Sequence, residues 1–202
     1  MPIRTLLRGA ALAALLATVL FGAVSPALAN ADNAAAARTA LKTSVDSILD
    51  IVKQPGYTDA AQRPALMDKV EEEIRQIFDF REFSARTVGV NWPSFTPDQQ
   101  DRFADAFASL LRATYLEKFD GYNGEQVLFT GELVSGKGDK VEVQTTVVVK
   151  DKQVPVAYRM LQNRQQRWVV YDVIIEGVSM VKNYRTQFQD LLEKGTADQL
   201  IE

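Results

Sequence analysis

The residues of this chain that could take part in chemistry are carboxylates, tyrosines and serines, because the sequence contains no histidine and no cysteine. Without imidazole or thiol groups, Ser-His triads, thiol nucleophiles and nearly all zinc sites are excluded. Acid–base catalysis by a carboxylate and a buried tyrosine remains, with Asp172 and either Tyr158 or Tyr184 as candidates. We expect no metal site and no cofactor.

Three motifs look functional but fit structural roles better. In "GVSMV" around Ser179, Val181 stands where a nucleophile elbow needs a second glycine, so Ser179 is better explained as a helix N-cap. "GELVSGKG", residues 131–138, has glycine after its lysine instead of the Ser or Thr of a phosphate-binding loop, and it lies between two expected strands, which favours a hairpin turn. Consecutive residues of a helix point in different directions, so the acidic run 71–73 is better explained as a solvated helical face than as a metal site.

The first 29 residues have the pattern of a secretory signal peptide. Arg4 and Arg8 give a basic start, residues 9–24 are an apolar run, and Ala27-Leu28-Ala29 is a small-x-small cleavage site. We predict cleavage after Ala29, which leaves residues 30–202 as one domain of about 173 residues. The alternative is an uncleaved membrane anchor, for which a run of about 16 residues is short.

The charge of the chain argues against nucleic acid as a partner. Removing Arg4 and Arg8 with the leader leaves 21 basic against 26 acidic residues, so the formal net charge changes from −3 to −5. An acidic protein is repelled by nucleic acid and by anionic lipid surfaces. Proteins and buried ligands are the expected partners.

Apolar periodicity and capping residues predict helices at both ends of the mature chain. Asp79, Thr96 and Ser179 are expected N-caps, and Pro55-Gly56 ends the first helix. "TADQ" near the C-terminus predicts a final short helical turn. The helices are expected over about 41–52, 64–78, 79–89 and 97–121, and from Ser179 to Gly195.

Four strands are expected between these helices. Short polar turns separate them, so neighbouring strands must be antiparallel and form a meander. Helices followed by a run of strands imply an α+β fold, with the helices packed on one face of a curled sheet. The strands are expected over 126–134, 140–150, 153–161 and 167–175.

The fourth strand is apolar on both alternating faces, which a strand that meets water on one side is not. Either the terminal segments cover its second face, or a cavity lies between the helices and the sheet. An empty cavity destabilises by about 24 cal/mol per Å³, so a large one is expected to hold an apolar ligand. Simple alternation places Trp168, Val170 and Ile174 on one face and Val169, Tyr171, Val173 and Ile175 on the other.

Four segments resemble the MlaC family, also called toluene-tolerance proteins: "FDFREFSARTVGVNW", "FTPDQQDRFADAFASLLRATYLEKFDGY", "VPVAYRM" and "RWVVYDVIIEGVSMVKNYRTQF". The resemblance extends from about Ala34 to Ile201. It implies a cystatin- or NTF2-like α+β fold, in which N-terminal helices pack on a curled four-stranded antiparallel sheet and a C-terminal helix closes the structure. It also implies a periplasmic phospholipid-binding protein.

The partners implied by this resemblance are two envelope complexes. Such proteins carry phospholipid between an outer-membrane lipoprotein complex and an inner-membrane ABC transporter complex with an MCE-type substrate-binding subunit, and so maintain outer-membrane lipid asymmetry. We expect a monomeric carrier without enzymatic activity. About 30 methylenes at roughly 0.8 kcal/mol each amount to about 24 kcal/mol, near the ceiling of non-covalent affinity. Release into water would therefore be too slow, and transfer requires docked complexes.

A lipid site would combine a mouth, a helical wall, a sheet floor and a closing helix, although each residue fits an ordinary core equally well. Arg159 and Arg185 are candidates for the lipid phosphate, with an ion pair to Asp172 as the alternative. The expected mouth residues are Phe80, Phe83, Val88 and Trp92, and the expected acyl-chain contacts are Phe103, Phe107, Leu110, Val143, Thr145, Val147, Val156, Tyr158, Trp168, Val170, Val173, Ile175, Val178, Val181 and Tyr184.

Two other functions remain open. One is an NTF2-like isomerase that uses Asp172 with Tyr158 or Tyr184 on a hydrophobic substrate. The other is a structural adaptor of an envelope complex, whose apolar side chains are all used in packing. A carrier should retain lipid, whereas an adaptor should contain no cavity.

Overall fold

The computed structural model describes residues 26–116, 122, 124–150 and 152–202. The predicted leader lies outside the described residues as far as residue 25, so the cleavage after Ala29 stays a prediction. None of the helices in the described ranges is both long and apolar enough to cross a membrane.

The helices begin at the predicted caps. The side chains of Asp79, Thr96, Ser179 and Thr196 each accept a hydrogen bond from the backbone amide three residues later. These bonds satisfy amides that have no partner within the helix. The helices are α1 (Pro26–Val52), η1 (Pro55–Thr58), α2 (Arg63–Ile77), α3 (Phe80–Val88), η2 (Gly89–Ser94), α4 (Pro97–Leu111), the π-helical turn η3 (Arg112–Leu116), α5 (Met180–Leu192) and α6 (Ala197–Ile201).

The five strands form one antiparallel sheet in the order β1-β2-β3-β4-β5. This confirms the α+β class and the meander. The short β5, which pairs with the end of β4, was not predicted, because two residues are too few to show a period. The strands are β1 (Gln126–Val134), β2 (Lys140–Val149), β3 (Lys152–Gln162), β4 (Trp168–Ile175) and β5 (Val178–Ser179).

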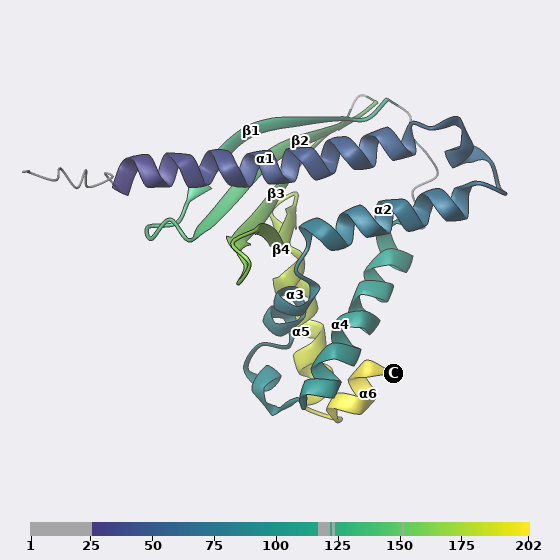
Figure 1. Ribbon diagram of the computed structural model, residues 1–202. Helices are drawn as coiled ribbons and strands as arrows, with labels where there is room; N and C mark the ends of the chain where they lie inside the picture. Colours follow the sequence, from purple (N-terminus) through teal and green to yellow (C-terminus); the bar gives the residue numbers. More distant parts are fainter. Residues whose placement is uncertain (1–25, 117–121, 123, 151) are drawn as a thin grey trace, which may run out of the picture.

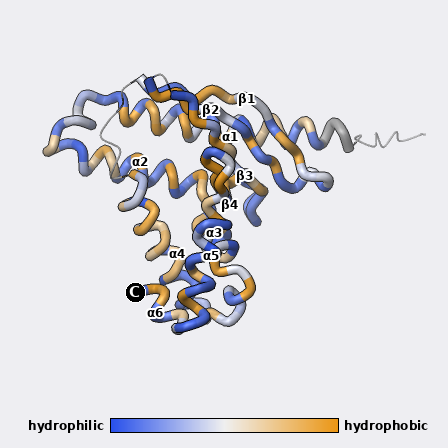
Figure 2. Tube along the Cα trace, turned by 180° about the vertical axis from the view of Figure 1, so that it is seen from behind, coloured by the Kyte–Doolittle hydropathy of each residue, from blue (hydrophilic) through white to orange (hydrophobic). Residues whose placement is uncertain are grey.

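The molecule has two parts that meet near β4 (Figure 1). One part, which we call the sheet half, contains α1, α2 and strands β1 to β4, with α1 lying across the sheet. The other part, which we call the helical lobe, contains α3 to α6. The apolar and polar residues alternate along α1 and α2, as in amphipathic helices that cover a core on one side (Figure 2).

Helix α1 begins well before the predicted start at residue 41. Its added turns are rich in alanine, which favours helix but gives no stripe of large apolar residues. Ala37 is fully buried against the sheet. The side-chain amide of Asn33 donates a hydrogen bond to the Gly138 carbonyl at 3.0 Å, and Arg38 forms an ion pair with Glu132 at 2.6 Å. These contacts attach α1 to β1 and to the turn before β2.

Strand β4 contains a bulge at Tyr171, because Val170 and Asp172 pair with consecutive residues of β3. One inserted residue reverses the alternation of side chains beyond it. Val173 therefore lies on the same face as Val170, in the core beneath α1. The prediction of simple alternation through β4 was wrong.

The outer edge of β4 is covered by the chain itself. Phe78 forms a parallel bridge with Val170, and the Asp79 amide donates to the Val170 carbonyl at 3.0 Å. The other end of β4 pairs with β5. This cover protects an edge that could otherwise pair with another chain, and it fixes the α2–α3 junction beside the sheet.

The buried apolar side chains form separate clusters in the two parts. The sheet core lies between α1 and the strands and includes Leu41, Val141, Val143, Met160, Trp168 and Val170. The aromatic core fills the helical lobe and includes Phe83, Phe95, Phe103, Phe107, Tyr184 and Phe188. A third cluster, with Val52, Tyr57, Leu66, Met67 and Val70, joins α1 to α2.

Candidate functional site

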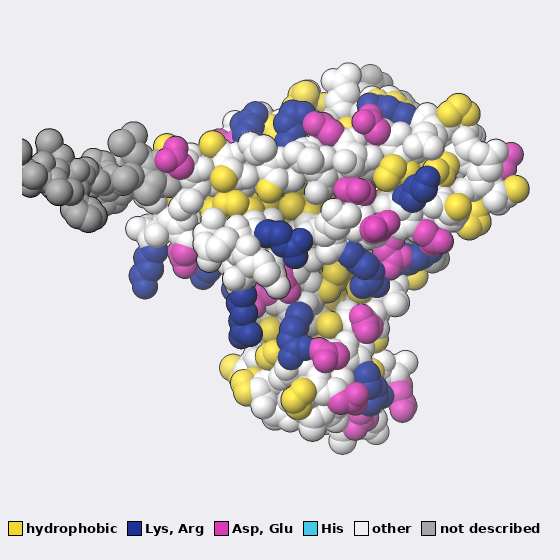
Figure 3. Space-filling view, in the orientation of Figure 1, with side chains coloured by type: hydrophobic (Ala, Val, Ile, Leu, Met, Phe, Trp, Pro, Cys, Tyr) yellow, Lys and Arg dark blue, Asp and Glu magenta, His cyan; other side chains and the backbone are white. Residues whose placement is uncertain are grey.

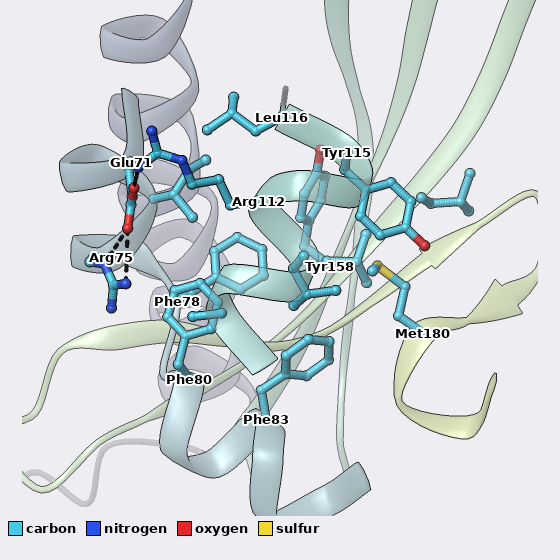
Figure 4. Close-up of a pocket in the computed structure, with 15 residues that line it drawn as sticks. Glu71, Arg75, Phe78, Phe80, Phe83, Arg112, Tyr115, Leu116, Tyr158 and Met180 are labelled. Carbon is cyan, nitrogen blue, oxygen red and sulfur yellow. Dashed lines mark hydrogen bonds and ion pairs between the residues drawn. The ribbon is translucent and has the colours of Figure 1, made fainter. Parts of the chain in front are cut away.

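An apolar cavity of about 250 Å³ lies where the sheet half meets the helical lobe. Its walls come from α2, the α2–α3 junction, α3, the end of α4, η3, β3, β4 and the start of α5 (Figure 4). The space-filling view shows hydrophobic side chains in the recess between the two parts (Figure 3). The lining residues are Glu71, Ile74, Arg75, Phe78, Phe80, Phe83, Ala108, Leu111, Arg112, Tyr115, Leu116, Tyr158, Val173, Ile175 and Met180.

Three phenylalanines at the α2–α3 junction form one wall. The Phe78 and Phe80 rings stack with centroids 5.7 Å apart, and Phe83 meets Phe78 edge-on at 6.4 Å. Asp79, which lies between Phe78 and Phe80 in the sequence, caps α3. The bridge from Phe78 to β4 holds this junction against the sheet. The capping turn therefore places aromatic side chains from two helices on one surface.

The sheet floor of the cavity depends on the β4 bulge. Tyr158 of β3 pairs with Val173 of β4, and both side chains line the cavity. Burial raises the pKa of Tyr158, and its hydrogen bond with Thr145 only partly offsets that effect. The phenol is therefore neutral at physiological pH, and the floor of the cavity carries no charge.

The wall opposite the sheet is formed where α4 changes geometry. The regular helix ends at Leu111, and η3 continues as a π-helical turn that brings Tyr115 and Leu116 to the cavity. Single π-turns inside α-helices occur frequently at functional sites. The predicted continuation of this helix through residues 117–121 lies outside the described residues.

Three charged side chains lie together at one end of the cavity (Figure 4). Glu71 accepts hydrogen bonds from Arg75, at 2.9 Å from Nε, and from Arg112. Burial alone would raise the pKa of Glu71, but the hydrogen bonds and charges of the two arginines outweigh burial and hold the pKa below its ordinary value. Glu71 is therefore a carboxylate, part of an ion cluster at the rim and not a residue of an isolated solvated face.

Five of the predicted lipid contacts line the cavity. Phe80 and Phe83 belong to the predicted mouth, and Tyr158, Val173 and Ile175 belong to the predicted sheet floor.

Most of the other predicted contacts lie in filled cores. Val88, Trp92, Phe103, Phe107, Val181 and Tyr184 belong to the aromatic core or pack against it, while Val143, Val147, Val156, Trp168 and Val170 belong to the sheet core or pack against it. The buried Thr145 hydroxyl donates to the Val156 carbonyl at 3.0 Å. Leu110 and Val178 are 45% and 60% exposed and do not line the cavity.

The two predicted phosphate ligands make structural contacts. Arg159 lies 3.1 Å from Glu142 and 3.2 Å from Asp172, which is the ion pair considered as the alternative. Arg185 donates two hydrogen bonds to the Arg86 carbonyl, from Nε at 2.8 Å and from Nη2 at 2.6 Å. Neither arginine lines the cavity.

The acid–base pair considered for an isomerase is not assembled in the cavity. Asp172 is 2% exposed and accepts hydrogen bonds from the Ser179 hydroxyl at 2.7 Å and the Val181 amide at 3.0 Å. It therefore anchors the start of α5. Because neighbouring strand residues point to opposite faces, Asp172 points away from Val173 and the cavity. Tyr184 lies in the aromatic core.

Ten of the fifteen residues that line the cavity are absent from the predicted contacts. Ile74 could have been found, since it lies four residues after the buried Val70 on the apolar side of α2. Phe78 was assigned to a helix end, and Met180, Tyr115 and Leu116 lay outside the patterns used. The rim charges were overlooked because Glu71 belongs to an acidic run and its partner Arg112 is 41 residues away in the chain.

The fold and the cavity define an α+β protein with an apolar cavity between its sheet half and its helical lobe. Residues 42–202 match the family described as "MlaC protein". The chain therefore belongs to the MlaC family, which confirms the resemblance noted from its sequence.

Two relatives extend this comparison. The chain is 21% identical over 154 residues to the intermembrane phospholipid transport system binding protein MlaC of Haemophilus influenzae, covering 75% of this chain and 68% of that protein. It also matches the structure of a phospholipid-binding protein from Ralstonia solanacearum in complex with a phospholipid. That match has a TM-score of 0.71 and 27% identity, and covers 82% of this chain and 92% of the other.

Proposed function

We propose that this protein binds a phospholipid with its acyl chains in the cavity and carries it through the periplasm between two membrane complexes. The observation that supports this most directly is the cavity itself, whose charged residues are confined to one end while the remaining lining residues are uncharged. Membership of the MlaC family supports phospholipid as the ligand, and the proposal requires no catalytic residue.

The size of the cavity determines how a lipid enters. An apolar cavity of about 150 Å³ holds one benzene molecule, so 250 Å³ has room for roughly ten carbon atoms. A diacyl lipid has about 30 methylenes. In this proposal a cavity of this size accepts part of the acyl chains, and deeper insertion requires the sheet half and the helical lobe to move apart.

The partners follow from the same energetics. Burial of the acyl chains is worth too much for release into water, so we propose direct transfer from docked complexes. The donor and acceptor would be an outer-membrane lipoprotein complex and an inner-membrane ABC transporter complex with an MCE-type subunit. A secretory leader cleaved after Ala29 would deliver the monomeric carrier to the periplasm, and amino-terminal sequencing of the exported protein should then begin at Asn30.

The decisive experiment is lipid analysis of the purified protein. The full chain is expressed in bacteria with its leader, purified without detergent, extracted with organic solvent and studied by mass spectrometry. We expect about one phospholipid per chain, and delipidated protein should take up phospholipid from vesicles. Protein that is free of lipid and takes up none would contradict the proposal and would favour the structural adaptor instead.

A further inference from the structure

The sheet half and the helical lobe are joined at two places around the cavity, and the two joints differ in kind. At β4 the joint consists of buried hydrogen bonds. The Asp79 amide donates to the Val170 carbonyl at 3.0 Å, and the buried Asp172 carboxylate accepts from the Ser179 hydroxyl and the Val181 amide. Breaking these bonds would leave buried polar groups without partners, which is costly.

The second joint is an ion cluster at one end of the cavity, which we define as Asp68, Glu71, Arg75 and Arg112. Glu71 of α2 accepts hydrogen bonds from Arg75 of the same helix, at 2.9 Å from Nε, and from Arg112 at the start of η3 (Figure 4). Asp68, which is also on α2, lies 3.4 Å from Arg112. Arg112 therefore connects the helical lobe to two carboxylates of the sheet half.

The ion cluster is the weaker of the two joints. The side chains of Glu71 and Arg112 are 21% and 33% exposed, and Asp68 is largely exposed, so water and salt reach these contacts. Ion pairs that are open to solvent contribute little to stability. Leu116 of η3 adds an apolar contact with the cluster that joins α1 to α2. Side-chain contacts of this kind can separate while the buried bonds at β4 remain.

We propose that the ion cluster is a latch that keeps the cavity closed, and that lipid enters where α2 and η3 separate while the joint at β4 stays intact. This inference rests on the proposed function and adds the place at which the cavity opens. A cavity of about 250 Å³ is too small for a whole diacyl lipid, so its walls must separate during loading. Glu71, Arg75 and Arg112 line the cavity, so breaking their contacts opens that end directly.

The test is the rate of lipid uptake. The delipidated full chain is mixed with vesicles of phosphatidylcholine, which carries no net charge, and bound lipid is quantified by mass spectrometry at successive times. Arg112→Gln should take up lipid about two- to fivefold faster than the wild-type protein, as expected for the loss of partly exposed ion pairs. Added sodium chloride should also accelerate uptake by the wild-type protein, because salt screens the cluster. This salt dependence should be weaker in Arg112→Gln.

Arg102→Gln is the matched control for the loss of one arginine. Arg102 pairs with Asp198 of α6 at 3.1 Å, within the helical lobe, and it does not line the cavity. Its uptake rate and salt dependence should equal those of the wild-type protein. Equal acceleration in both variants would mean that uptake follows general stability, and would overturn the latch.

A cross-link tests the same joint in the opposite direction. The chain contains no cysteine, so Glu71→Cys combined with Arg112→Cys provides the only two thiols. Before cross-linking, this double variant should take up lipid faster than the wild-type protein. After a short bismaleimide joins the two thiols, it should lose nearly all uptake. Capping each thiol separately with N-ethylmaleimide should leave uptake fast.

The outcomes distinguish this inference from the proposed function. If the cross-linked protein takes up lipid as fast as the wild-type protein, the cavity opens elsewhere, although the protein remains a lipid carrier. Slower uptake by Arg112→Gln would also overturn the latch, because the cluster would then assist the capture of lipid. If the wild-type protein takes up no lipid under any condition, the proposed function itself is wrong.

Discussion

The aromatic core and the cavity are neighbours built from similar residues, yet one is filled and the other is hollow. In the aromatic core, Phe107 lies within 5.8 Å, between ring centroids, of Phe83, Phe103, Tyr184 and Phe188. In the cavity wall, the Phe80 ring stacks on Phe78 and has Arg75 over its face. Aromatic content therefore does not distinguish a core from a binding site.

Arrangement makes the difference. The aromatic core forms where α3, α4 and α5 pack directly on one another, so their rings interlock. The cavity forms where these helices approach the sheet half, at a bulged strand and a π-helical turn. Phe83 belongs to both regions, since it is fully buried in the core and also lines the cavity.

The largest expected effect separates the filled region from the hollow one. Phe107→Ala should destabilise the protein by about 3–5 kcal/mol, because it leaves a void among packed rings. Phe80→Ala is the matched control at the cavity, where we expect less than about half that loss and a clear reduction in bound lipid. Urea unfolding with lipid quantification measures both. Equal losses of stability would mean that the cavity wall is packed as tightly as the core.

The second effect concerns the joint between the two parts. Asp172→Asn should destabilise by about 1–3 kcal/mol, because a buried carboxylate that receives three hydrogen bonds is replaced by an amide that cannot satisfy all three donors. Lipid binding per folded molecule should not change. Thermal unfolding and lipid extraction test this. Loss of a catalytic turnover without loss of stability would instead revive the isomerase.

The third effect tests which part of one sheet face is hollow, because Val173 and Val147 point to the same face. Val173→Trp introduces a large side chain into the cavity and should reduce bound lipid about tenfold or more while lowering the melting temperature little. Val147→Trp is the control, since Val147 packs against the sheet core and does not line the cavity. It should lower stability by about 1–3 kcal/mol through overpacking. Equal lipid content in the two variants would show that the acyl chains lie elsewhere.

The last effect appears only at alkaline pH, and it is a pH dependence of the boundary between core and cavity. Burial and a hydrogen bond with Tyr115 raise the pKa of Tyr184 to about 12. Because this pKa is above the value of about 10 in the unfolded chain, the folded state retains the proton longer. The corresponding stability is fully present below pH 10 and is lost as the pH rises through 12.

The control for this effect is Tyr184→Phe, which cannot ionise at that position. The free energy of unfolding, measured by urea titration at several pH values, should fall less steeply between pH 10 and 12 in this variant than in the wild-type protein. Tyr57, Tyr158 and Tyr171 also have a raised pKa and remain in both proteins. An identical slope would mean that Tyr184 titrates as in the unfolded chain.

The sequence by itself determined most of the elements and the family. Capping at Asp79, Thr96 and Ser179 is local chemistry, because each side chain reaches an amide three residues away, and strand alternation with short turns specifies an antiparallel meander. The absence of histidine and cysteine likewise limited the chemistry without any knowledge of the fold.

Tertiary structure alone decided which apolar residues line the cavity. A bulge at Tyr171 moved Val173 and Ile175 to the face beneath the helices, and nothing in the local pattern marks where an extra residue is accommodated. Packing decided that Phe103 and Phe107 fill a core, and long-range pairing placed Arg112 beside Glu71. A hydrophobic side chain gains from leaving water in the same way whether it meets another side chain or a ligand, so its sequence position cannot tell which one it meets.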